Sequence, residues 1–334
     1  MSNNQIIEPI TDPRNIRFTV KPIDPKYDAI WKLYKKQFEA LWSAEEIKYS
    51  KADVDDFNSL KPEEQQFLKM VLAFFASSDG IVNYNLRERF LTEFTPAEIV
   101  ITYSFQMMIE NIHGEVYSDL ILNIIDDPVE RDKLFNSINE IPAIKKMADW
   151  AIKWIHSKES IAVRLIAFAI VEGVFFSGMF AAIFWLKRNR GAGRLFLEAI
   201  NKSNKFIARD EGLHVTFACA VYAHIINRVD QSVVHDMFRE ANEISAEFMC
   251  DSISCKMIGM SQELMIQYIN YVSDQLLVML KYDKLYNATN PFDFMDSITL
   301  LSKDNFFENR PDAYQRAHNE ENKDRWGFEL LADF

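Results

Sequence analysis

Residues 109–121, which read IENIHGEVYSDLI, decide the fold and hold the first candidate site of this chain. Glu110 and His113 are three residues apart, and Tyr117 follows His113 by four. On an α-helix, residues three or four apart lie on the same face, so the carboxylate, the imidazole and the phenol would project in one direction. A single Glu-x-x-His pair is weak evidence for a metal site, so the rest of the sequence has to supply the context.

That context is a second pair and two lone acids. Glu211 and His214 repeat the spacing in IARDEGLH, while Asp79 in FFASSDGIVN and Glu172 in AIVEGVFF each stand among apolar residues. Burying a carboxylate without a partner costs several kcal/mol, so such acids need a proton, an ion pair or a metal. Four carboxylates and two imidazoles form a hard, mostly anionic ligand set that suits two iron or manganese ions better than zinc.

The whole sequence favours long helices. It contains only 9 glycines and 10 prolines, while 49% of its residues are hydrophobic. Capping residues and apolar periodicity predict helices at about 28–44, 62–91, 95–125, 128–155, 159–189, 204–226, 232–256 and 262–285.

Four of these helices carry the candidate ligands. In chain order they hold a lone acid, a Glu-x-x-His pair, a second lone acid and a second Glu-x-x-His pair. This order is similar to that of ferritin-like di-metal carboxylate proteins, in which two helices give one carboxylate each and two give a Glu-x-x-His pair. The predicted fold class is therefore all-α, a ferritin-like helical bundle with a buried di-metal carboxylate site. We expect an N-terminal arm at 1–27, one helical domain at 28–301 and a flexible polar tail at 302–334.

Composition argues against several other classes of protein. A net charge of -12 repels a phosphate backbone, so no nucleic-acid binding is expected. Three cysteines without metal-type spacing and a polar N-terminus indicate a cytoplasmic protein with reduced thiols. Residues 165–186 carry one charge and are long enough to cross a membrane, but the amphipathic remainder of the chain favours a buried core helix and no membrane partner.

The motifs together resemble the small, radical-generating subunit of class I ribonucleotide reductases of eukaryotic and viral type. The segments that carry the resemblance are DAIWKLYKKQFEALWSAEEI, SDGIVN, IENIHGEVYSDLI, VEGVFFSG, IARDEGLH and NPFDFM. The resemblance implies two iron ions, with manganese as an alternative, held by Asp79, Glu110, His113, Glu172, Glu211 and His214. It also implies a stable tyrosyl radical on Tyr117 in an apolar pocket formed by Phe176, Phe180 and Ile207.

Further roles follow from the same resemblance. A radical-transfer chain would run from Trp31 through Asp210 to His113, with Tyr314 in the tail as a mobile relay. Phe328 and Phe334 in the C-terminal GFELLADF would dock into a large subunit that binds and reduces the ribonucleotide. The resemblance also implies a homodimer.

Two other functions use a similar ligand set. A di-iron oxygenase or desaturase would need a substrate cavity beside the metals and no Tyr-Trp relay. A ferritin-type iron store would need a shorter, cage-forming chain without a docking tail. Size-exclusion chromatography would separate a dimer from such a cage.

Overall fold

The computed structural model describes residues 7–191, 195–252 and 255–295, and within these ranges it is helical with no strand. The ligand-bearing core consists of α3 (Pro62–Asn85), α5 (Ala97–Ile124), α9 (Ile161–Ile170), α10 (Phe176–Gly191) and α11 (Glu198–Tyr222). The surrounding helices are α1 (Asp28–Glu39), α2 (Lys51–Asn58), α4 (Leu91–Glu93), α6 (Pro128–Phe135), α7 (Ser137–Glu140), α8 (Pro142–Ile155), α12 (Gln231–Ala246) and α13 (Gln262–Met279).

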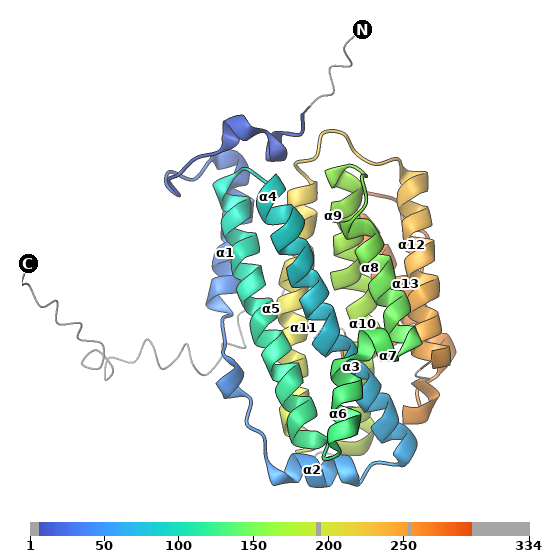
Figure 1. Ribbon diagram of the computed structural model, residues 1–334. Coiled ribbons are helices and arrows are strands. Elements are labelled where there is room, and N and C mark those ends of the chain that lie inside the picture. The colour runs from blue at the N-terminus through green and yellow to red at the C-terminus, as the bar shows by residue number, and fades with distance from the viewer. Residues whose placement is uncertain (1–6, 192–194, 253–254, 296–334) are drawn as a thin grey trace, which may run out of the picture.

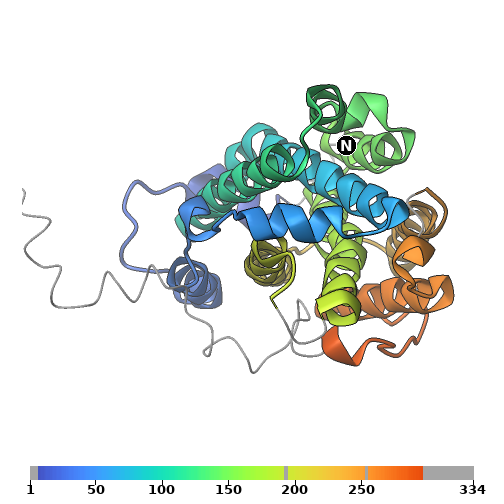
Figure 2. The same ribbon diagram turned by 90° about the horizontal axis from the view of Figure 1, so that it is seen from below.

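The long helices lie side by side along one axis, and α2 crosses one end of the bundle (Figure 1). The hairpin predicted from the capping signals is present, because α3 and α5 run in opposite directions and pack along each other. The view along the bundle shows α11 between α1 on one side and α10 on the other (Figure 2). The predicted all-α bundle is therefore confirmed.

The most apolar segment of the chain is a core helix. Within Ile161–Arg190, an 18-residue window has a mean hydropathy of 2.1, and that whole window is buried inside the structure. The predicted buried helix is thus confirmed, and burial against other helices explains its composition without a membrane. It is not one regular α-helix, however, because α9 and α10 are joined by a π-helical turn, η6 (Val171–Phe175).

The described part of the N-terminal arm differs from the extended segment that its prolines predict. It forms three short 3₁₀ turns, η1 (Pro9–Thr11), η2 (Pro13–Asn15) and η3 (Pro25–Tyr27). The Glu8 carboxylate accepts hydrogen bonds of 2.8 Å from the backbone N–H groups of Ile226 and Asn227 after α11. The arm therefore packs on the end of the bundle.

Candidate metal centre

Four helical segments bring the six predicted ligands together at the centre of the bundle. Asp79 comes from α3, Glu110 and His113 from α5, Glu172 from η6, and Glu211 and His214 from α11. Each is at most 2% exposed. Their candidate donor atoms form two groups in which all atoms lie within 4.8 Å of one another: Glu110, Glu172, Glu211 and His214, and Asp79, Glu110 and His113. Glu110 belongs to both groups, so its carboxylate links them.

The backbone is irregular at Glu172, the lone acid that lies between α9 and α10. Glu172 lies in the π-helical turn η6, where the sequence predicted a continuous helix. A π-turn accommodates an extra residue and changes the direction of the side chains that follow, and such turns often occur at functional sites. The residues on both sides of Glu172 in the sequence are apolar, so no periodicity in the sequence could reveal the turn.

Gln106 is a contributor that the sequence reasoning missed. Its buried side chain donates hydrogen bonds to the Oε1 atoms of Glu172, at 3.0 Å, and Glu110, at 3.2 Å. Gln106 therefore fixes one oxygen of each carboxylate and leaves the other free. Its position one turn before Glu110 was the available signal.

The imidazoles approach the carboxylates from both sides. His214 Nδ1 lies 2.9 Å from Glu110 Oε1 and 3.2 Å from Glu211 Oε2. His113 Nδ1 lies 3.1 Å from Glu211 Oε1 and 3.3 Å from Glu110 Oε2. Such close approaches between donor atoms of several ligands are typical of a site where cations sit between them.

A second observation also indicates that these residues fit a pair of metal ions. Several buried donor atoms have no hydrogen-bond partner within the described chain: both oxygens of Asp79, Glu110 Oε2, His113 Nδ1, Glu172 Oε2 and Glu211 Oε1. Leaving one buried polar atom unsatisfied costs about 1–3 kcal/mol, and more for a charged group. Metal ions would satisfy this whole set at once.

Burial also perturbs the protonation of the cluster. It raises the pKa of Asp79 and of Glu172 well above the usual range, and the neighbouring carboxylates raise both further. Burial opposes ionisation of Glu211 too, but a hydrogen bond from Glu172 and the charge of His214 hold its pKa below the usual range. Although burial acts against the charged imidazole, the carboxylates raise the pKa of His214 to about 9. The cluster therefore holds protons that cations would displace.

Tyr117 lies in a dry aromatic environment. It is 1% exposed, and its hydroxyl has no hydrogen-bond partner among the described residues. Phe75 stacks on its ring at 4.7 Å with an interplanar angle of 5°. Phe75 in turn contacts the predicted pocket residues Phe180, at 4.8 Å, and Phe176, at 5.6 Å.

The pocket predicted around Tyr117 did not include Phe75. Ile207 is buried as well, but Phe75 is the ring that stacks on the phenol. Burial raises the pKa of Tyr117 well above its usual range, and the charge of Asp79 adds to this. The phenol therefore stays protonated in the metal-free protein.

The structure contradicts the predicted hydrogen bond between Trp31 and Asp210. Trp42, rather than Trp31, donates its indole N–H to Asp210 Oδ2 at 2.6 Å, and the same oxygen lies 3.2 Å from His113 Nε2. Trp31 is half-buried and packs on Tyr34 within α1. The physical reason is that α1 ends at Glu39, so the chain turns and directs Trp42 into the core.

The guanidinium of Arg209 holds this hydrogen-bonded chain in place. Arg209 donates to Asp210 Oδ1 at 2.9 and 3.1 Å and to the carbonyl oxygen of Ala40 at 2.7 Å. Because of the Arg209 and His113 contacts the pKa of the buried Asp210 lies below its usual value, although burial acts in the opposite direction. Asp210 is thus a charged acceptor between Trp42 and His113.

Three predicted residues cannot be placed. Tyr314, Phe328 and Phe334 lie outside the described residues, so their relay and docking roles stay predictions.

The bundle and its buried carboxylate-imidazole cluster define the class of di-metal carboxylate proteins with a ferritin-like fold. The family model described as ribonucleotide reductase, small chain, matches residues 17–291, and the chain belongs to this family. Its function is accordingly that of the small subunit of ribonucleoside-diphosphate reductase, which confirms the resemblance seen in the sequence.

Individual relatives agree with this assignment. The ribonucleoside-diphosphate reductase small chain of Spisula solidissima is 49% identical over 95% of this chain and 80% of its own. The one of Vaccinia virus (strain L-IVP) is 47% identical over 98% of this chain and 100% of its own. The solved ribonucleotide reductase Rnr4 homodimer of Saccharomyces cerevisiae has a TM-score of 0.77 at 33% identity, and the match covers 86% of this chain and 88% of the yeast chain.

Proposed function

We propose that the cluster binds two metal ions, iron or manganese, and that the protein uses them with dioxygen to form a stable radical on Tyr117. The observation that carries this proposal is the set of buried donor atoms without partners around Glu110, next to a buried phenol whose hydroxyl is also without a partner. When bound, the reduced metal pair would supply two of the four electrons that reduce dioxygen to water, while Tyr117 would supply a third and an external one-electron reductant the fourth. This subunit would therefore carry the oxidant, and the large subunit would carry out ribonucleotide reduction.

Asp79, Glu110, His113, Glu172, Glu211 and His214 would hold the metals. Gln106 would orient Glu110 and Glu172 by its two hydrogen bonds, since each carboxylate keeps an oxygen that Gln106 does not contact. Hydrogen-bonded neighbours of this kind commonly fix the orientation of metal ligands.

Tyr117 would store the oxidising equivalent. Its pKa is raised by burial, so oxidation must remove an electron together with the hydroxyl proton. Phe75, Phe176, Phe180 and Ile207 offer no exchangeable hydrogen and exclude water, so a phenoxyl radical among them would have few reaction partners.

Trp42, Asp210 and His113 would carry the oxidising equivalent between the cluster and the surface of the subunit. Their two hydrogen bonds share one carboxylate oxygen, which gives a continuous route from a ligand imidazole to an indole. Tyr314 would extend this route through the tail, and Phe328 and Phe334 would attach the tail to the large subunit.

The assembly belongs to the same proposal. We expect a homodimer, because the yeast relative is described as one, and a cytoplasmic location, because the chain looks like a reduced intracellular protein. Neither a nucleic acid nor a membrane is part of the proposed function.

Electron paramagnetic resonance tests the proposal. The metal-free protein is loaded with ferrous iron without oxygen, exposed to air, and compared with Tyr117→Phe. We expect a tyrosyl signal in the wild type and none in the variant, with equal iron content in both. Bound iron without any tyrosyl signal would instead favour a di-iron oxygenase, and the same signal in Tyr117→Phe would place the radical elsewhere.

A further inference from the structure

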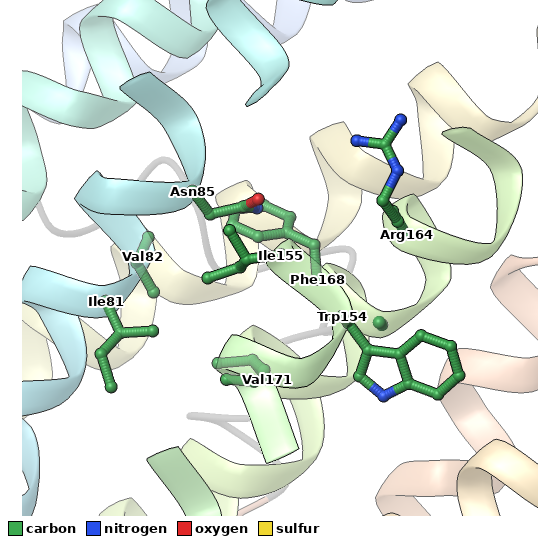
Figure 3. Close-up of a pocket in the computed structure, with 10 residues that line it drawn as sticks. Ile81, Val82, Asn85, Trp154, Ile155, Arg164, Phe168 and Val171 are labelled. Carbon is green, nitrogen blue, oxygen red and sulfur yellow. The ribbon is translucent and has the colours of Figure 1, made fainter. Parts of the chain in front are cut away.

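A small pocket lies beside the two helical segments that give the lone acids. It is bounded by α3, α8 and α9, and Figure 3 shows Val82, Asn85, Ile155, Phe168 and Val171 around it. Its volume is about 20 Å³. One water molecule needs roughly 10–15 Å³, so a molecule of two or three atoms fits inside the pocket, which opens to solvent on one side.

The walls of this pocket are mostly apolar. Isoleucine, valine, alanine, phenylalanine and tryptophan side chains from the three helices supply most of the lining. Arg164 also lines it, but its guanidinium is committed to Glu93 by a paired contact, with one distance of 2.7 Å. Small cavities with apolar walls bind apolar gases such as xenon in preference to water.

Asn85 is the exception in the lining. It is 6% exposed, and its carboxamide makes no hydrogen bond with any other described residue. Neither of its amide atoms is among the fully buried polar atoms without a partner, so water that enters the pocket can hydrogen-bond to the carboxamide. The space beside Asn85 is therefore left open by the protein rather than filled by its own side chains.

The position of the pocket relates it to the candidate metal centre. Val82 follows Asp79 by three residues on α3, Phe168 precedes Glu172 by four, and Val171 is its direct neighbour. Residues three apart on an α-helix share a face, so Val82 lies on the side of α3 that carries Asp79. The pocket lining thus comes within one helical turn of Asp79 and within one residue of Glu172 along the chain.

We infer that this pocket is a holding site for dioxygen on its way to the candidate metal centre. The inference rests on the proposed function, which needs dioxygen inside a bundle whose ligands are at most 2% exposed. Dioxygen matches the pocket in size and in its apolar character. A water molecule on Asn85 would compete with it, so occupancy by gas depends on how firmly Asn85 holds that water.

Three variants test the inference. Ala151→Phe fills the pocket from α8, which gives none of the six candidate ligands. Ala143→Phe is the matched control, because it makes the same change on α8 at a position that does not line the pocket. Asn85→Leu removes the polar partner of water and nearly keeps the side-chain size. Circular dichroism and thermal unfolding establish that each variant is folded, and Ala151→Leu replaces Ala151→Phe if the larger ring prevents folding.

The first readout is ¹²⁹Xe nuclear magnetic resonance on the metal-free protein, with xenon as the probe. A saturable xenon site is expected in the wild type and in Ala143→Phe, lost in Ala151→Phe, and retained or strengthened in Asn85→Leu. Xenon binding that is unchanged in Ala151→Phe, or absent from the wild type, would overturn the assignment of the pocket as a gas site.

The second readout is the rate at which the tyrosyl signal forms when ferrous-loaded protein is mixed with oxygen. Ala151→Phe should be slower than Ala143→Phe at low oxygen, with the difference lost at high oxygen and the final yield unchanged. Equal rates at every oxygen concentration, with xenon binding lost, would overturn the dioxygen role while the proposed function stands. No tyrosyl signal in any protein, including the wild type, would refute the proposed function and the dioxygen role with it.

Discussion

Replacing Trp42 by phenylalanine tests the revised transfer chain most directly. The change removes the indole N–H that donates to Asp210 at 2.6 Å. A hydrogen bond to a charged group contributes about 1.5–3 kcal/mol, so Trp42→Phe should lower the free energy of unfolding by roughly this amount. Asp210 would keep its contacts with Arg209 and His113, so the six candidate ligands should stay in place.

The matched control is Trp31→Phe. Trp31 is half-buried, packs on Tyr34 and lies near Lys21 and Lys35, and it makes no hydrogen bond with Asp210. A substitution that breaks no hydrogen bond at such a partly exposed position is expected to change stability by less than about 0.5 kcal/mol.

Both variants are assayed for bound iron, tyrosyl signal, chemical denaturation and turnover with the large subunit. Trp42→Phe should bind iron as the wild type does, unfold at lower denaturant and lose turnover, whereas Trp31→Phe should match the wild type in all four. Normal turnover of Trp42→Phe together with lost turnover of Trp31→Phe would refute the reasoning and restore the original assignment.

Three further outcomes are expected. Glu172→Ala should lose metal but remain largely helical, as measured by metal analysis and circular dichroism; unchanged metal content would remove Glu172 from the ligand set. In the metal-free protein, the pKa of His214 is raised from 6.5 to about 9, so the stability that its protonation gives is full below pH 6.5 and is lost as the pH rises through about 9. The raised pKa values of Asp79 and Glu172 act in the same direction, so denaturation midpoints should fall over this range without metal and change less with it; a flat profile without metal would contradict this. Removing residues 328–334 should abolish turnover with the large subunit while the tyrosyl signal remains, and normal turnover would exclude the docking role of Phe328 and Phe334.

The sequence predicts the candidate ligands well because their spacing is a property of single helices. Glu110 with His113, and Glu211 with His214, must share a helix face wherever those helices go. The meeting of four segments followed from similarity to known di-metal proteins, since no physical pattern in one sequence states which helices will be neighbours.

The choice between Trp31 and Trp42 could not be made from the sequence motif. Both tryptophans lie in DAIWKLYKKQFEALWSAEEI, and the motif alone does not say which one reaches Asp210. The answer depends on where α1 ends, and neither glycine nor proline marks that end after Glu39. The carbonyl of Ala40 is instead held by Arg209, which is 169 positions further along the chain.

Phe75 was missed for a related reason. Phe74 and Phe75 are adjacent and both are buried, so burial patterns cannot tell which ring faces Tyr117. Only the packing of α3 against α5 makes Phe75 the stacked partner. The π-turn at Glu172 likewise gives no signal in the sequence, because the residues on both sides of it are apolar.

The buried helix at Ile161–Arg190 has a consequence for the synthesis of this protein. A ribosome completes this segment before it makes α11, α12 and α13, which later cover it. Until then the nascent chain exposes a stretch long enough to span a bilayer, which favours aggregation or capture by membrane-insertion machinery. Glu172 near its middle opposes insertion by roughly 3 kcal/mol, a value typical of a charged side chain at the centre of a bilayer helix. The acid proposed as a metal ligand in the mature protein would thus also help to keep the unfinished chain in water.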